Sequence, residues 1–218
     1  HIEQGPILEA RDIRVGVVTG IQGVSWFEVE VRGQTAHAGT TPRGLRRDAL
    51  EAAMALAIAM RDVCRDDEDI LRFTIGRFAV SPGSINTVPD TVRFSIDLRH
   101  PDASVLSSVR ARFESLFAQS WRGCTVAMNV LGEQAPVAFP EWLVNEVDSG
   151  AEAAGAKRLK LASGAFHDAL YLARHCPTAM LFIPCRDGVS HHPAESITKA
   201  DADIGARVLT ETLVRLAG

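Results

Sequence analysis

The sequence has little cysteine and no long apolar run. Its four cysteines lie far apart and form no Cys-x-x-Cys pair; they are Cys64, Cys124, Cys176 and Cys185. Neither a disulfide framework nor a thiolate zinc site is therefore expected. The longest apolar run, residues 52–60, is about half as long as a membrane span. We expect reduced, packed cysteines in a cytoplasmic protein that has no membrane partner.

The sequence also lacks a basic surface and the motifs of several enzyme classes. Its formal net charge is −4, and no Lys/Arg-rich stripe with interleaved aromatic residues occurs, which argues against a nucleic-acid partner. Gly-x-Ser-x-Gly, the P-loop and Gly-x-Gly-x-x-Gly are absent, so a serine hydrolase and a nucleotide-dependent enzyme lose their sequence support. With 46% hydrophobic and 23% charged residues, the chain has the composition of a globular protein and not of a disordered one.

The region 23–139 has a pattern of elements that predicts a complete small domain. Alternating or β-rich segments predict strands, and apolar stripes at helical spacing predict helices. The strands are expected over 24–32, 70–80, 91–98 and 124–130, and the helices over 47–63 and 103–120. This β-α-β-β-α-β order forms a four-stranded antiparallel sheet with both helices on one face, the ferredoxin-like sandwich.

The flanking residues, 1–22 and 140–218, are expected to belong to a different domain. Residues 1–22 predict one or two strands. Residues 140–218 alternate helices, over 142–154, 167–175 and 200–216, with strands over 158–162 and 178–183. This alternation is typical of a parallel sheet in an α/β domain, but the strands are fewer than such a sheet needs. We therefore expect the region 23–139 to be inserted into a larger α/β domain, of which this chain holds the C-terminal portion.

Histidines are the first candidates for chemistry. His1 stands two residues before a carboxylate in His-Ile-Glu-Gln-Gly-Pro, and both groups are zinc ligands; a terminal histidine without a role is the alternative. His191 and His192 follow a predicted buried strand, where α/β sheets place binding loops, and at most one of the two points at a ligand. His37 lies among small residues with room for a ligand, although an exposed loop histidine is the commoner outcome.

Two further segments carry polar candidates. In Ser163–Ala169, Gly-Ala precedes a predicted helix start, which could bind an anion or simply be a capped helix end. Asn86 and Arg99 bracket a predicted hairpin, and a guanidinium binds a carboxylate in bidentate fashion. The alternative for Arg99 is a surface ion pair with Asp97 or Asp102.

Several motifs occur in a fixed order along almost the whole chain. They are HIEQGPILE (1–9), GQTAHAGTTP (33–42), RRDAL (46–50), SINTVP (84–89), DLR (97–99), SGAFHDA (163–169) and SHHPAE (190–195). Together they resemble the zinc-dependent amidohydrolases that include N-carbamoyl-L-amino-acid hydrolase, allantoate amidohydrolase and β-ureidopropionase. These enzymes belong to the aminoacylase and carboxypeptidase clan of metallopeptidases.

The resemblance implies a metal-dependent α/β hydrolase domain interrupted by a lid domain, 23–139, that forms a homodimer. It implies two Zn²⁺ or Mn²⁺ ions per intact active site, with His1 and His191 as the ligands present in this chain. His37 is implied to stabilise the oxyanion on the carbonyl of a small ureido-carboxylate. Asn86 and Arg99 are implied to bind that substrate with it, the arginine receiving the carboxylate.

The resemblance also implies what is missing. Gly164 and Phe166 are expected beside the substrate, although relatives often carry glycine at the position of Phe166. The family's other metal ligands and its general-base glutamate precede the HIEQG motif, so these 218 residues alone are expected to be inactive. The resemblance also implies that the lid residues reach an active site that is completed across a dimer.

Two alternatives remain open: a dimerisation and ligand-binding module without catalysis, and an aminoacylase or peptidase of the same clan, which cleaves plain amides. The HIEQG motif together with Asn86 and Arg99 favours the ureido branch.

Overall fold

The computed structural model describes residues 1–218, which divide into two compact units. Unit 1 comprises His1–Gln22 and Pro136–Gly218, and unit 2 comprises Gly23–Ala135. Unit 2 ends at Ala135 and not at the predicted residue 139. The reason is that a short strand, β8 (Val137–Ala138), pairs with a strand of unit 1. None of the helices is both long enough and apolar enough to cross a bilayer.

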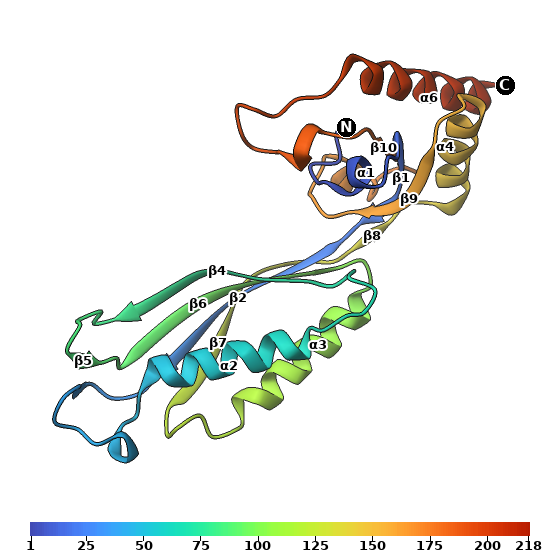
Figure 1. The fold of residues 1–218 in the computed structure, drawn as a ribbon. Coiled ribbons are helices and arrows are strands. Elements are labelled where there is room, and N and C mark those ends of the chain that lie inside the picture. The colour runs from blue at the N-terminus through green and yellow to red at the C-terminus, as the bar shows by residue number, and fades with distance from the viewer. The chain divides into compact units, whose positions relative to one another are not determined.

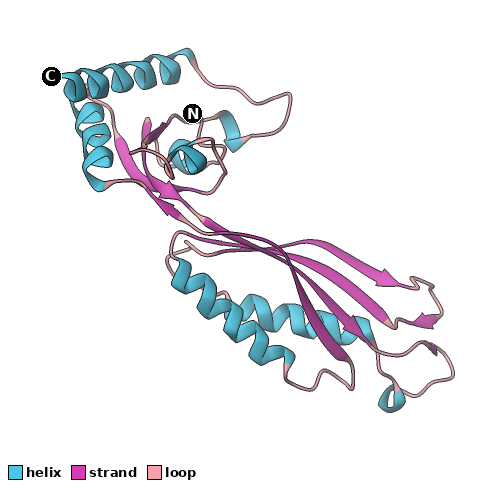
Figure 2. Ribbon diagram, turned by 180° about the vertical axis from the view of Figure 1, so that it is seen from behind, coloured by secondary structure: helices cyan, strands magenta, loops and turns pink.

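Unit 2 is a ferredoxin-like sandwich. Its sheet has the strand order β4-β6-β2-β7, and all neighbouring strands are antiparallel. Both helices, α2 and α3, cover one face of this sheet, and the other face carries no helix (Figures 1 and 2). The prediction of a β-α-β-β-α-β sandwich is confirmed. The bounds are β2 Gly23–Arg32, α2 Ala49–Val63, β4 Arg72–Ser81, β6 Thr91–His100, α3 Ala103–Phe117 and β7 Thr125–Gln134.

The core of unit 2 follows from the alternation in its central strands. Phe27 and Val29 of β2 and Phe94 of β6 are fully buried, whereas the residues between them point away from the helices. Helix α2 begins after Asp48, whose side chain accepts hydrogen bonds from the backbone N–H groups of Leu50 and Glu51, as an N-cap does. Removing a buried phenylalanine ring from such a core costs about 3–5 kcal/mol.

The sheet of unit 1 is mixed and not parallel as expected. Strand β1 (Val15–Ile21) pairs in parallel with β9 (Arg158–Ser163), but antiparallel with β10 (Met180–Phe182) and with β8. The predicted helix over 167–175 is reduced to α5 (Ala169–Leu172). A helix of this length spans only about 6 Å. Strand β10, which follows it, runs opposite to β9, because it pairs antiparallel with β1 while β9 pairs in parallel.

The remaining elements of unit 1 are helical. Two long helices contact each other and the sheet, and two short ones contact each other. Residues 1–22, predicted as one or two strands, hold a short helix before β1. The bounds are α1 Ile7–Ala10, α4 Glu141–Ala153, η2 Arg186–Gly188 and α6 Lys199–Ala217.

Candidate active site

The structure brings two of the predicted site residues, His37 and Asn86, to the same end of unit 2. Strand β3 (Ala36–His37) pairs with β5 (Thr87–Val88), with His37 opposite Thr87. The backbone N–H of Ala38 donates to the carbonyl of Asn86 at 3.0 Å. These two loops therefore form one tip, built from backbone hydrogen bonds, on which both side chains are exposed.

The ring of His37 is oriented by the backbone of its own loop. Its Nδ1 accepts hydrogen bonds from the N–H groups of Gly39, at 3.1 Å, and Thr40, at 3.3 Å. A nitrogen that accepts carries no proton, so the neutral ring has its proton on Nε2. His37 therefore presents an N–H donor to a ligand at this tip.

Asn86 is oriented by its neighbours in the same way. Its Oδ1 accepts from the hydroxyl of Ser84 at 2.9 Å and from that of Thr87 at 3.4 Å. With the amide oxygen engaged in these contacts, the NH₂ group is the end left to donate. The tip thus combines two uncharged N–H donors, from His37 and Asn86.

Arg99 lies at the opposite end of the same sheet. In the β2–β6 register, Thr91 faces Arg32 near the tip, whereas Arg99 faces Val24. The eight residue steps from Thr91 to Arg99 correspond to about 26 Å at roughly 3.3 Å per residue. A single chain therefore does not bring Arg99 to the tip that carries His37.

The guanidinium of Arg99 forms the ion pair that the sequence offered as its alternative. Nε and Nη2 donate to Oδ1 and Oδ2 of Asp97 at 2.8 and 2.7 Å, and the indole N–H of Trp26 donates to Oδ2 at 2.9 Å. Burial opposes ionisation of Asp97, but the hydrogen bonds from Arg99 and Trp26 outweigh it and lower the pKa of this carboxyl. The same pairing raises the pKa of Arg99. This cation is therefore held in a fixed orientation by a carboxylate.

In unit 1, Glu3 caps a helix and does not accompany His1 as a metal ligand. Its carboxylate accepts from the N–H groups of Ile7 at 3.0 Å and Leu8 at 2.8 Å, at the start of α1. The segment itself runs beside β10, where Ile183 exchanges backbone hydrogen bonds of 3.0 Å with His1 and Glu3. The sequence pattern suggested a histidine–carboxylate corner, but the helix start uses the carboxylate.

The structure places a second histidine, His167, against His1. The two ring centroids are 4.7 Å apart in an edge-to-face arrangement, and Nε2 of His167 lies 3.0 Å from the hydroxyl of Ser163. Burial is the main reason that the pKa of His167 is lowered. The sequence indicates this histidine only as part of a helix start. Its place in the SGAFHDA motif, beside Gly164 and Phe166, was the available signal.

The loop that carries His191 is tightly folded. His191 has φ of 57°, a left-handed conformation that is uncommon for residues other than glycine. Its N–H donates to the carboxylate of Glu195 at 3.2 Å, and Nδ1 of His192 accepts from the N–H of Ala194 at 3.1 Å. His192 is thus engaged within the loop, which leaves His191 as the candidate ligand of the pair.

The N-terminal segment and the segment that leads to His191 lie side by side. The thiol of Cys185 donates to the carbonyl of Gly5 at 3.5 Å, and the N–H of Asp187 donates to the carboxylate of Glu9 at 2.7 Å. Nevertheless, no group of three or more His, Cys, Asp or Glu side chains is arranged to hold a metal ion. Catalytic zinc sites use three protein ligands. The donors in this chain therefore do not form a metal site by themselves, and no metal-dependent step follows from them.

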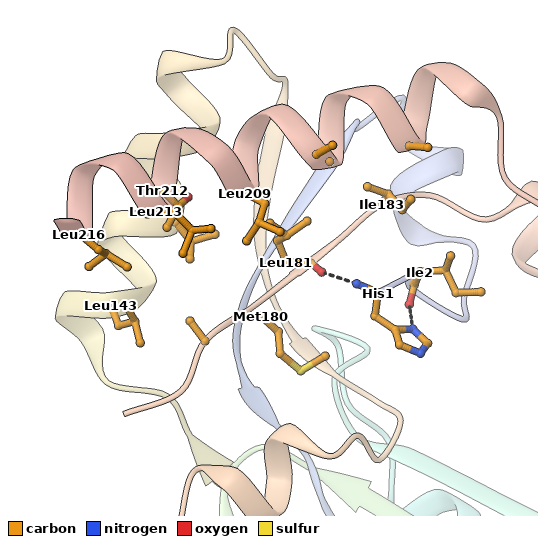
Figure 3. A pocket seen from close by; sticks show the side chains of 15 residues that line it. His1, Ile2, Leu143, Met180, Leu181, Ile183, Leu209, Thr212, Leu213 and Leu216 are labelled. Carbon is orange, nitrogen blue, oxygen red and sulfur yellow. Dashed lines mark hydrogen bonds between the residues drawn. The ribbon is translucent and has the colours of Figure 1, made fainter. Parts of the chain in front are cut away.

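Unit 1 has a groove of about 640 Å³, and its lining is mainly apolar. Helices α4 and α6 and strand β10 form it, with Leu143, Leu181, Leu209 and Leu213 in its wall and His1 at its edge (Figure 3). Such a lining offers few groups that could orient a ureido group or a carboxylate. An exposed apolar surface of this kind is instead typical of a face that another segment covers.

Comparison with known proteins gives a consistent picture. A model of peptidase family M20/M25/M40 matches residues 1–215. An N-carbamoyl-L-amino-acid amidohydrolase of Rhizobium meliloti is 37% identical over 221 residues, covering 100% of this chain and 53% of the relative. The allantoate amidohydrolase of Escherichia coli is 33% identical over 219 residues, covering 100% of this chain and 53% of the relative.

Solved structures show the same relationship. A hydantoinase/carbamoylase family amidase from Burkholderia multivorans has a TM-score of 0.90 and 40% identity, covering 98% of this chain and 52% of that chain. This chain spans about half the length of the curated relatives it matches. The match extends over both units and confirms the resemblance. The chain belongs to peptidase family M20/M25/M40.

Proposed function

We propose that this chain is part of a metal-dependent amidohydrolase that cleaves the carbamoyl C–N bond of N-carbamoyl amino acids or allantoate. The observation that carries the proposal is the pair of N–H donors at the tip of unit 2. Nε2 of His37 and the amide of Asn86 are both uncharged donors whose acceptor atoms are engaged by neighbouring groups. Donors fixed in this way stabilise negative charge as it develops on a carbonyl oxygen.

The proposed roles divide between two ends of unit 2. Arg99 receives the substrate carboxylate, and His37 and Asn86 donate to the ureido oxygen when water adds to the carbonyl carbon. Because roughly 26 Å of strand separates these groups, one substrate meets Arg99 of one chain and His37 of a second copy. The site is therefore completed across a homodimer.

The β4 edge of unit 2 supports this homodimer. Strand β4 has a neighbour on one side only, and α2 exposes Met54 and Ile58 beside it, at 47% and 52%. A shallow apolar depression joins Ile58 to Phe73 and Ile75 of β4. At the β7 edge, the outward residues of α3 are mainly serine, arginine and glutamate. We propose that β4 and α2 pair with the same elements of the second copy.

The metal centre is proposed to use His1 and His191 together with ligands outside these 218 residues. Two Zn²⁺ or Mn²⁺ ions would bind per intact site and would supply Lewis-acid chemistry. Gly164 and Phe166, next to His167, would border the substrate. The apolar groove of unit 1 supports a larger α/β catalytic domain that covers it. We propose unit 2 as the lid of that domain and the cytoplasm as the location of the enzyme. This chain alone is accordingly expected to be inactive.

Hydrolysis assays test the proposal. A longer protein that contains these residues is expected to hydrolyse N-carbamoyl amino acids or allantoate and to be much slower with N-acetyl amino acids. The purified 218-residue chain is expected to release no product from either class. Faster hydrolysis of N-acetyl substrates would favour an aminoacylase, and hydrolysis by the chain alone would contradict the incomplete metal centre.

A further inference from the structure

One arginine, Arg46, holds the turn that orients His37. Its Nε donates to the carbonyl of Thr41 at 2.9 Å, and its Nη2 donates to the carbonyl of Ala38 at 2.6 Å. These two carbonyls bracket Gly39 and Thr40, whose N–H groups bind Nδ1 of the histidine. A single guanidinium therefore binds the carbonyls on both sides of the peptide segment that orients the His37 ring.

The backbone on both sides of Arg46 is held by local hydrogen bonds. Its own N–H donates to the carbonyl of Arg43 in the short helix η1 (Arg43–Leu45), and Asp48, two residues later, caps α2. The side chain is half-buried. A guanidinium is planar and presents its donors in a fixed fork, so it holds two carbonyls at a set spacing in a way that a flexible ammonium does not.

We propose that Arg46 is a positioning residue: it fixes the Ala38–Thr41 turn so that Nδ1 of His37 accepts and Nε2–H points outward. This positioning role does not depend on which reaction the protein catalyses. Its consequence for catalysis rests on the proposed function, because only there does Nε2–H of His37 meet a substrate oxygen. Arg46 touches no substrate and acts through the turn and the ring.

The turn and the ring can be observed directly in the 218-residue chain by NMR. In Arg46→Ala, the exchange of the Gly39 and Thr40 amide protons is expected to rise about tenfold, since two charge-assisted bonds to the turn are lost. The ¹⁵N resonances of Nδ1 and Nε2 of His37 are expected to move towards each other as the second tautomer becomes populated. Arg46→Lys is expected to give a smaller change in the same direction.

Two controls are measured by the same NMR experiments as the Arg46 variants. Arg43→Ala removes an equal charge from the same loop, but Arg43 pairs with the side chain of Glu51 at 3.3 Å, so neither readout is expected to change. The ring of His192, whose Nδ1 accepts from Ala194, serves as an internal reference that stays unchanged in every variant.

The outcomes separate this inference from the proposed function. Unchanged amide exchange and unchanged His37 resonances in a folded Arg46→Ala, or in Arg46→Lys if the alanine variant does not fold, would overturn it. In an active longer protein, Arg46→Lys is expected to lower kcat about tenfold with KM nearly unchanged. If the ring changes but kcat does not, the positioning role stands and the proposed role of His37 fails.

Discussion

The two ends of the unit 2 sheet present their polar groups in opposite ways. At the tip, His37 and Asn86 are uncharged donors oriented by backbone and hydroxyl groups. At the other end, Arg99 is a full charge held by Asp97 and, through it, by Trp26. Uncharged donors suit a charge that appears only during the reaction, whereas a permanent cation suits a permanent carboxylate. The difference indicates one role for each end.

Mixing two inactive variants tests most sharply whether the two ends serve one site. If the site is shared across a homodimer, a mixed dimer of His37→Ala and Arg99→Ala has one site in which both residues are intact. Random mixing is therefore expected to restore about a quarter of the wild-type activity. The measurement is hydrolysis after the two variants of an active longer protein are dissociated and reassembled. Mixing His37→Ala with Asn86→Ala is the control, because both residues lie at the same tip and no activity should return.

Loss of the tip donor is the next largest effect. His37→Ala is expected to lower kcat about 10²–10³-fold, as the removal of one oxyanion donor does, with a smaller change in KM. Steady-state kinetics of the longer protein measure both constants. His175→Ala is the matched control because that histidine is exposed and belongs to no candidate site. Equal losses for the two variants would remove the distinction between His37 and an ordinary histidine.

At the opposite end, Arg99→Lys is expected to act mainly on substrate binding. A lysine cannot reproduce the bidentate pairing with a carboxylate, so KM is expected to rise about tenfold while kcat changes less. Arg93→Lys, on the same strand and paired with Glu30, should leave both constants near wild type. A fall in kcat alone would place Arg99 in the chemical step and contradict the proposed division of roles.

The smallest expected effect is on the pH dependence of the free energy of unfolding. Because the pKa of Asp97 is lowered in the folded chain, its ionisation stabilises the fold above the ordinary pKa of about 3.9, and this contribution is lost as pH falls through the lowered value. Asp97→Asn is expected to cost about 1 kcal/mol at neutral pH, since the pair is only partly buried. Urea denaturation from neutral pH to below the ordinary pKa of about 3.9 measures this loss of stability. The variant should lose less stability than wild type on acidification.

Much of the fold was predictable because its signals are local. The alternation in β2 and β6 and the apolar stripes of α2 and α3 reproduce the strand and helix pattern of unit 2. The parallel sheet predicted for unit 1 was wrong, because the direction of β10 follows from its antiparallel pairing with β1, a contact between segments far apart in the sequence. The short α5 could not be recognised from its residues, since a pattern of apolar positions does not report where a helix stops.

The candidate site was predictable as a set of residues but not as an arrangement. His37, Asn86 and Arg99 stand in motifs that identify them individually. Their separation follows from the β2–β6 register, a contact between distant segments that no single motif contains. Likewise, the sequence suggests a metal-ligand role for Glu3 only from its closeness to His1 in the chain, whereas its oxygens accept hydrogen bonds from the N–H groups of α1.

The sequence by itself determined the family, the ferredoxin-like order of unit 2 and the identity of the candidate residues, because periodicity and motif spacing are properties of short segments. Only the tertiary structure decided the mixed sheet of unit 1, the pairing of Arg99 with Asp97 and the orientation of the His37 ring. Each of these depends on hydrogen bonds between groups whose geometry exists only once the backbone has folded.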